Sequence, residues 1–327
     1  MKISGFYQQA SCLLAALIIT ILPVNSHAAE KKTDNFSFGL YDRHYDYYIP
    51  DNVDANAPLL LVFHGLTGDS ERLWADPNNA LDLPKLADEK RFIVMWMGST
   101  KIAIPKFGQS WNAGVCCSIA VTLNVDDVGY TLKAIERIKS RLPTNVTIDD
   151  SRVYAIGHSN GAAMVNRLAL QKSDVFTAVV PVSFPLVNNH SWRIPASWIQ
   201  HRNVPVLAMH GTKDLIVPYY NRRLLTGLPI PTLSPLSPYF LDTAQESLQT
   251  WATRNKCIGQ PLTTETHTSI GKYQTQIYSA CGGSATVGLH TFYGGGGITG
   301  HRPEYPKDNG GMDVIRESWR FLSQYQK

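Results

Sequence analysis

Residues 152–161 read Arg-Val-Tyr-Ala-Ile-Gly-His-Ser-Asn-Gly (RVYAIGHSNG), and this stretch decides the fold. Its first half has the composition of a short strand, and residues 161–170 follow a helical pattern. The middle fits G-x-S-x-G, the sharp strand-to-helix turn that lifts a nucleophilic serine above the edge of a sheet. Small residues are needed at such a turn because the strand and the helix approach each other closely. The stretch therefore predicts that Ser159 is a nucleophile.

Strands and helices alternate on both sides of this turn. Strands are predicted at residues 59–63, 92–96, 152–156, 177–183, 204–209, 273–279 and 286–293. Helices are predicted at residues 126–141, 161–170, 242–254 and 313–325. The alternation predicts the α/β-hydrolase fold, with a mostly parallel central sheet and helices on both faces. The proline-rich residues 219–240 are predicted to run irregularly over the surface.

Length and composition fit a compact globular protein and do not indicate nucleic-acid binding. The chain has 327 residues, of which 44% are hydrophobic and only 17% charged, as is typical of a compact domain. The formal net charge is +4, and the basic residues are not gathered into runs, so no nucleic-acid surface is indicated. We expect residues 29–327 to form one α/β-hydrolase catalytic domain.

The first residues have the pattern of a secretory signal peptide. Lys2 gives a positive start, residues 13–24 are apolar, and small residues lead to Ala28 and Ala29. An uncleaved membrane anchor is the alternative, but the apolar run is short for a span and contains Pro23. We therefore expect a signal peptide at residues 1–28, a secreted or periplasmic protein, and no membrane association after cleavage.

Four cysteines remain once Cys12 is removed with the signal peptide. An even number in an exported protein indicates disulfides. Cys257 and Cys281 flank an alternating segment and are predicted to pair. Cys116 and Cys117 are adjacent, a bridge between them would be strained, and their pairing stays open. The chain has no pair of CxxC motifs and no histidine at ligand spacing, so no metal site is predicted.

A serine nucleophile needs a base and an orienting acid, which follow it along the chain in this fold. Asp214 is the predicted acid because it lies in the loop after the strand at residues 204–209. A solvated turn aspartate is the alternative interpretation of Asp214. Asp242 is the second candidate for the acid, but it lies at a predicted helix start and fits an N-cap better.

Three histidines follow Asp214 in the chain. His267 lies in a polar stretch, and His290 lies inside a predicted strand, where a side chain is usually packed. His301 follows the glycine run 294–297 in a loop, from which it could reach the serine. His301 is therefore the predicted base.

The tetrahedral intermediate of such a reaction needs two backbone donors. One is predicted to be the amide of Asn160, which follows the nucleophile at the start of a helix. The other is predicted to be the amide of Leu66, in the turn after the first core strand. His64 precedes the serine, in the wrong order for the base, and is predicted to be structural.

Several motifs along the chain together resemble an exported esterase family that groups polyhydroxybutyrate depolymerases with feruloyl and acetylxylan esterases. The motifs are FHG at residues 63–65, WNAGVCC at 111–117, VDDVG at 125–129, RVY at 152–154, the serine turn, HGTKD at 210–214, VPY at 217–219 and residues 251–257. The resemblance implies a catalytic triad of Ser159, Asp214 and His301. The chain departs from the family pattern where residues 298–300 separate the glycine run from His301, where Arg302 replaces a common aromatic residue, and at Leu66.

These residues predict a serine carboxylic-ester hydrolase that needs no cofactor. Its partner would be a small-molecule or oligomeric ester, either a short-chain, a hydroxybutyrate-type or a feruloyl or acetyl ester. A peptidase or thioesterase could use the same triad. A binding protein on a hydrolase scaffold is the alternative from another class, although such a protein gains nothing from a retained triad.

Overall fold

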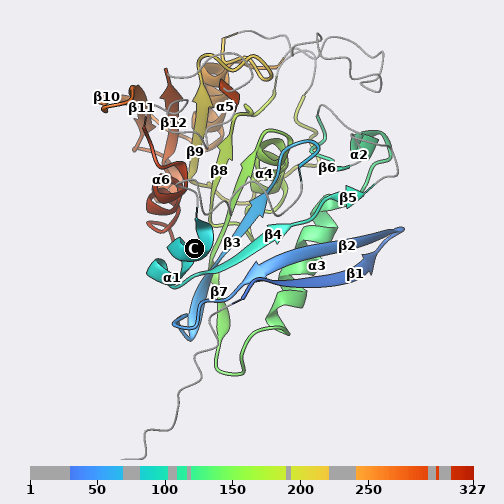
Figure 1. Cartoon of the computed structure of the whole chain (residues 1–327). Helices are drawn as coiled ribbons and strands as arrows, with labels where there is room; N and C mark the ends of the chain where they lie inside the picture. The colour runs from blue at the N-terminus through green and yellow to red at the C-terminus, as the bar shows by residue number, and fades with distance from the viewer. Residues whose placement is uncertain are drawn as a thin grey trace, which may run out of the picture.

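A ten-stranded sheet runs through the computed structural model, with the strand order β1-β2-β4-β3-β7-β8-β9-β12-β11-β10 (Figure 1). The structure describes residues 30–68, 82–101, 109–115, 119–188, 193–220, 241–293, 300–301 and 311–327. The predicted signal peptide, Cys116, Cys117 and the stretch 221–240 lie outside these residues.

Parallel strands form the centre of the sheet. They are β3 (Asn56–Phe63), β4 (Ile93–Met97), β7 (Thr147–His158), β8 (Ala178–Val182), β9 (Val206–Gly211) and β12 (Val287–Phe292). Four of them, β4, β8, β9 and β12, are buried along their whole length, as expected of parallel strands covered on both faces. Each coincides with a predicted strand.

Antiparallel strands lie at the two edges of this parallel core. At one edge, β1 (Lys32–Phe38) pairs with β2 (Tyr41–Tyr48), which pairs with β4. At the other edge, β10 (Leu262–His267) pairs with β11 (Lys272–Tyr278), which pairs with β12. A separate small sheet joins β5 (Thr100–Lys101) to β6 (Gln109–Ser110). The sequence predicted β11, but not β1, β2 or β10.

Helices cover both faces of the sheet (Figure 1). One face packs against α3 (Asp127–Lys139), α4 (Asn160–Gln171) and α5 (Ala244–Arg254), and the other against α1 (Leu83–Lys90) and α6 (Val314–Leu322). Alternate residues of β3 divide between the two cores: Leu59 and Leu61 face the first, and Leu60 and Val62 the second. Two short elements complete the order, α2 (Ile119–Thr122) and the 3₁₀ turn η1 (Gly282–Ser284). The predicted fold class is confirmed.

The prediction that Asp242 caps a helix is wrong by one residue. The N-cap of α5 is Thr243, whose side chain accepts from the Glu246 amide while the Glu246 carboxylate accepts from the Thr243 amide. This reciprocal pair satisfies two free amides at once. Asp242 is buried, and its carboxylate accepts instead from the Asn188 amide at 2.6 Å.

The turn between β7 and α4 brings the backbone of three elements unusually close. A Cβ added to Gly157 would lie 2.3 Å from the Gly161 carbonyl oxygen, and one added to Gly161 would lie 2.3 Å from the Phe63 carbonyl oxygen at the end of β3. Ser159 makes the turn with φ 54° and ψ −122°, a conformation that costs a non-glycine residue about 1–3 kcal/mol. Ser159 is therefore held in a strained position by the packing around it.

A disulfide joins Cys257 to Cys281 across a sequence separation of 24 residues. It ties the chain just after α5 to the chain just after β11 and encloses the β10–β11 hairpin. The predicted pairing is present in the structure.

No helix within the described ranges has both the length and the apolar composition needed to cross a membrane.

Replacing both cysteines by serine, Cys257→Ser with Cys281→Ser, is expected to lower the free energy of unfolding by roughly 3 kcal/mol, because a cross-link over a loop of this size restricts the unfolded chain. Urea unfolding of the variant, compared with the oxidised and reduced parent protein, measures the change. Mass mapping of non-reduced peptides checks the bond itself. Free thiols at both positions in oxidised protein would contradict the pairing.

Gly161→Ala is expected to destabilise the fold by about 3 kcal/mol, because the new methyl group meets main-chain atoms that cannot rotate away. Gly259→Ala is the matched control: that glycine has φ +79° but nothing within 4 Å of the added Cβ. The control should lose only about 1–2 kcal/mol, the ordinary cost of a side chain in the left-handed region. Equal losses in the two variants would remove the steric argument.

Candidate active site

The predicted site residues come from loops at the carboxyl ends of the parallel strands, where α/β sheets form their sites. Ser159 follows β7, Leu66 follows β3, and Asp214 follows β9. His301 comes from the chain beyond β12 and lies against Asp214. Residues far apart in the sequence are therefore gathered at one edge of the sheet.

Asp214 is buried and accepts hydrogen bonds on both carboxylate oxygens. Its Oδ1 accepts from the amides of Ile216 at 2.9 Å and Val217 at 2.8 Å. Its Oδ2 accepts from His301 Nδ1 at 2.7 Å and lies 3.2 Å from His210 Nε2. Burial alone would raise the pKa of Asp214, but the charge of His301 and the hydrogen bonds from His210 and His301 outweigh it and lower the pKa below its usual range. The surroundings are therefore built for an ionised carboxylate.

His301 is also buried, and its ring is oriented by Asp214. Since the Asp214 carboxylate is an acceptor, Nδ1 of His301 carries the hydrogen, and Nε2 of the neutral ring keeps a lone pair. The residue before His301 lies close to the turn that carries Asp214: a Cβ added to Gly300 would lie 2.5 Å from the Lys213 carbonyl oxygen. This pairing of an imidazole with a buried carboxylate has the geometry that the base and the acid of a Ser-His-Asp system require.

The turn that carries Leu66 lies directly beside Ser159. A Cβ added to Gly65 would lie 3.2 Å from the Ser159 Cβ. The turn is held by hydrogen bonds from the Gly68 amide to the Gly65 carbonyl and from the Thr67 amide to the Gln109 carbonyl, both 3.0 Å. In the described part of the chain, the Leu66 amide donates to no protein group, which leaves it able to face a ligand.

The side chain of Asn160 has a structural role that sequence reasoning missed. Its Oδ1 accepts from the Trp111 amide at 2.7 Å, and its Nδ2 donates to the Trp111 carbonyl at 3.3 Å. The Trp111 indole Nε1 in turn donates to the His64 carbonyl at 2.9 Å. Trp111 therefore joins the serine turn to the turn that carries Leu66.

Beneath Trp111 lies a fully buried ion pair. Arg43 Nη2 is 2.7 Å from Asp127 Oδ1, and the other oxygen of Asp127 accepts from the Asn112 amide at 2.6 Å. Burial raises the pKa of Asp127, and Arg43 opposes that rise. The Arg43 guanidinium also lies over the Tyr130 ring, 3.6 Å from its centroid. The Asn112 amide thus attaches the segment at Trp111 to Asp127, the first residue of α3.

His290 and His64, which were not predicted to be the base, have other partners in the structure. His290 is buried in β12 with Nδ1 2.7 Å from Thr275 Oγ1 and Nε2 3.0 Å from Glu317 Oε1. Burial raises the pKa of Glu317, but hydrogen bonds from His290 and Arg320 outweigh it and lower the pKa to about 2. His64 is buried with its ring 5.1 Å from that of Trp111, as expected of a structural histidine.

Two further histidines contact the site and were not singled out by sequence. His210 Nε2 carries one hydrogen, which it shares between the Val217 carbonyl oxygen at 2.8 Å and Asp214 Oδ2 at 3.2 Å. His158 lies 2.7 Å from the His301 carbonyl oxygen through its Nε2. Both occupy variable or flanking positions of the motifs, so only their contacts in space could identify them.

Among the described residues, no group of three or more histidine, cysteine, aspartate or glutamate side chains could hold a metal ion.

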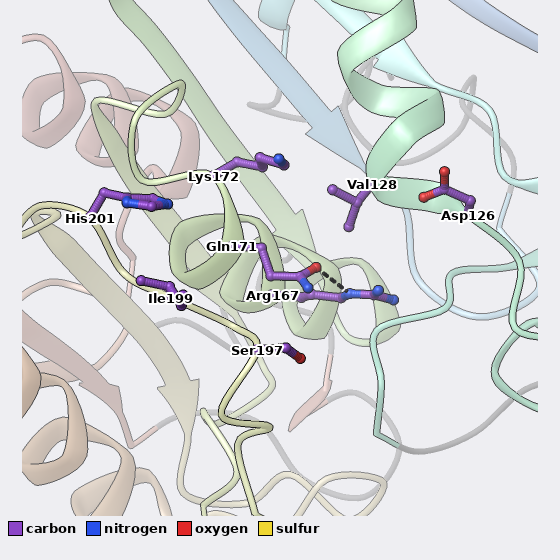
Figure 2. A pocket seen from close by; sticks show the side chains of 8 residues that line it. All are labelled: Asp126, Val128, Arg167, Gln171, Lys172, Ser197, Ile199 and His201. Carbon is purple, nitrogen blue, oxygen red and sulfur yellow. Dashed lines mark hydrogen bonds between the residues drawn. The ribbon is translucent and has the colours of Figure 1, made fainter.

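A hollow of about 340 Å³ lies on another part of the surface (Figure 2). It is lined by Arg167, Gln171 and Lys172 at the far end of α4, and by residues from the start of α3 and from the loop before β9. Arg167 donates there to Gln171, and its guanidinium lies 4.9 Å from the centroid of the Trp198 ring. Arg167 is eight residues beyond Ser159, which is about 12 Å along the helix, and the hollow includes none of the predicted site residues.

Comparison with known proteins identifies relatives of this chain. The phospholipase/carboxylesterase family matches residues 47–227. Feruloyl esterase B of Piromyces equi is 30% identical over 253 residues, which are 76% of this chain and 40% of that protein. Poly(3-hydroxyalkanoate) depolymerase C of Paucimonas lemoignei is 26% identical over 173 residues, 53% of this chain and 39% of that protein. The chain thus spans about two fifths of the length of these curated relatives.

Among solved structures, the acetyl xylan esterase from Aspergillus awamori superposes with a TM-score of 0.58 at 14% identity, over 89% of this chain and 99% of that one. This likeness supports the fold. The resemblance that the sequence motifs indicated is confirmed by the named relatives. The chain belongs to the phospholipase/carboxylesterase family of α/β-hydrolases.

Proposed function

We propose that this protein hydrolyses carboxylic esters with Ser159 as nucleophile, His301 as general base and Asp214 as the orienting acid. The observation that carries the proposal is the 2.7 Å hydrogen bond from His301 Nδ1 to the buried Asp214 carboxylate, at the sheet edge that also presents Ser159. Membership of the carboxylesterase family supports it.

In the proposed reaction, Ser159 Oγ attacks the ester carbonyl carbon while Nε2 of His301 accepts the hydroxyl proton. Asp214 stabilises the imidazolium that forms and keeps its ring oriented. The same proton then passes to the departing alcohol as the C–O bond breaks, which leaves an acyl group on Ser159. Water, activated by His301 in the same way, releases the acid and restores the serine.

The negative charge on the tetrahedral oxygen needs fixed donors. We propose the amides of Leu66 and Asn160 for this role. The contact between Gly65 and Ser159 supports the first, and the position of Asn160 as the first residue of α4 supports the second. Because both amides belong to backbone that is tightly packed, they would lose little entropy on meeting the oxyanion.

The proposed substrates are short-chain, hydroxybutyrate-type or feruloyl and acetyl esters, as small molecules or oligomers. The similarity to feruloyl esterase B, to poly(3-hydroxyalkanoate) depolymerase C and to a probable acetylxylan esterase of Aspergillus clavatus supports this range. Rates on a panel of feruloyl, acetyl-sugar and hydroxybutyrate-oligomer esters would rank the acyl groups.

We also propose that the protein acts outside the cytoplasm, after removal of residues 1–28. The Cys257–Cys281 bond supports this location because disulfides form and persist in oxidising compartments.

Ser159→Ala is expected to reduce hydrolysis of p-nitrophenyl acetate on the order of 10⁶-fold, because the nucleophile is lost. A serine-reactive phosphonate should inactivate the parent protein and leave the variant unlabelled. Circular dichroism checks that the variant is folded. Near-normal turnover by folded Ser159→Ala would refute the assignment of the nucleophile.

His301→Ala is expected to be nearly as inactive as Ser159→Ala, because triad members act as a unit. His290→Ala is the matched comparison, since His290 is another buried histidine paired with a carboxylate. It should lose stability and keep its kcat. If His290→Ala were inactive and His301→Ala active, the base would have to be reassigned to His290.

A further inference from the structure

His158, the residue before the nucleophile, contacts the chain that carries the proposed base. Its Nε2 is 2.7 Å from the His301 carbonyl oxygen, and the two imidazole rings have centroids 4.8 Å apart at an angle of 51°. The contact spans 143 residues of sequence, and His158 is buried. It therefore ties two loops of the site together in the protein interior.

The direction of this hydrogen bond follows from the chemistry of its two atoms. A main-chain carbonyl oxygen only accepts, so Nε2 of His158 must carry the hydrogen and donate. Losing this donor would leave a buried carbonyl oxygen without its partner, which is costly away from water. The contact between His158 and His301 is thus a hydrogen bond of defined direction and not only van der Waals packing.

The described contacts of His301 involve its ring, its carbonyl oxygen and the residue before it. Within the described residues, its ring is held by Asp214, its carbonyl by His158, and the preceding Gly300 packs against the turn at Lys213. Asp214 orients the ring of His301 through Nδ1, but that bond alone does not fix the main chain that carries the ring. The hydrogen bond from His158 to the His301 carbonyl attaches this main chain to the strand that leads into the serine turn.

We propose that His158 is a positioning residue. Through the hydrogen bond from its Nε2–H to the His301 carbonyl oxygen, it holds His301 in place relative to Ser159. The inference rests on the proposed function of Ser159 and His301. Since residues 158 and 159 are neighbours in one rigid strand-to-helix turn, any force that holds His301 to His158 also fixes it relative to Ser159. The variable position before the serine thereby aligns the base with the nucleophile.

Two substitutions separate the hydrogen bond from the space that the ring fills. His158→Phe keeps an aromatic ring and removes the donor, and is expected to lower kcat on the order of 10- to 100-fold, as misplacement of a catalytic group by about 1 Å does. KM should change little, because the acyl and alcohol contacts are untouched. His158→Gln places an amide N–H near the position of Nε2 and is expected to recover most of the lost kcat.

The control is His290→Phe, which makes the same exchange at a buried histidine outside the site. It should lose stability by a similar amount and keep its kcat. Parent-like kcat in folded His158→Phe would overturn the inference. Equal losses in His158→Phe and His158→Gln would also overturn it, since shape and not the donor would then matter.

A second measurement does not depend on turnover. The proton shared by His301 Nδ1 and Asp214 should give a low-field ¹H resonance, which His158→Phe should broaden by faster exchange and His290→Phe should leave sharp. If the parent protein lacks esterase activity, or Ser159→Ala retains it, the proposed function fails, and this resonance still decides the role of His158. An unchanged resonance in His158→Phe would overturn the positioning role.

Discussion

The close approach of α4 to the end of β3 is the constraint on which the rest of the structure depends. Gly161 lies so near β3 that an added Cβ would be 2.3 Å from one carbonyl oxygen and 2.4 Å from the next. Because the helix begins there, the chain must turn within a residue, and Ser159 takes the strained conformation with φ 54°. Most of α4 is buried, and that burial offsets a local cost of about 1–3 kcal/mol. The half-buried position of Ser159 at the end of the strand is thus a consequence of how the helix packs.

The same approach explains the polar network behind the site. Because α4 packs against the end of β3, the Asn160 side chain accepts a hydrogen bond from the Trp111 amide. The Trp111 indole in turn donates to the His64 carbonyl. The next residue, Asn112, donates its amide to Asp127 at 2.6 Å. This bond connects the segment at Trp111 to the pair of Arg43 and Asp127, whose side chains are both 0% exposed. Removing one member of this pair would leave an uncompensated charge in the interior. The pair therefore helps to hold the segment at Trp111, which supports the turn that carries Leu66.

The sequence predicted the parallel core well because continuous apolar runs mark strands that are buried on both faces. It missed β10 because Leu262–His267 is largely exposed and polar, and a solvated edge strand has no apolar pattern to read. The Thr243–Glu246 capping box follows a spacing that the sequence shows, and it lies one residue beyond Asp242, where the helical pattern was predicted to begin. The contact of His158 with His301 joins residues 143 positions apart, so no local pattern could reveal it.

The two halves of the proposed triad are supported in different ways. Ser159 is held by backbone, since its amide donates to the Val182 carbonyl and α4 begins at the next residue. His301 and Asp214 are held mainly by side-chain contacts, and Asp214 collects donors from two amides and two histidines. These donors keep the pKa of Asp214 below its usual range, so the carboxylate stays ionised throughout the neutral range of pH. A proton taken from the serine would therefore stay on the imidazole of His301, beside a carboxylate whose orientation is already fixed. Backbone packing therefore sets the position of Ser159, the proposed nucleophile. A few directed hydrogen bonds set the position of His301, its proposed base.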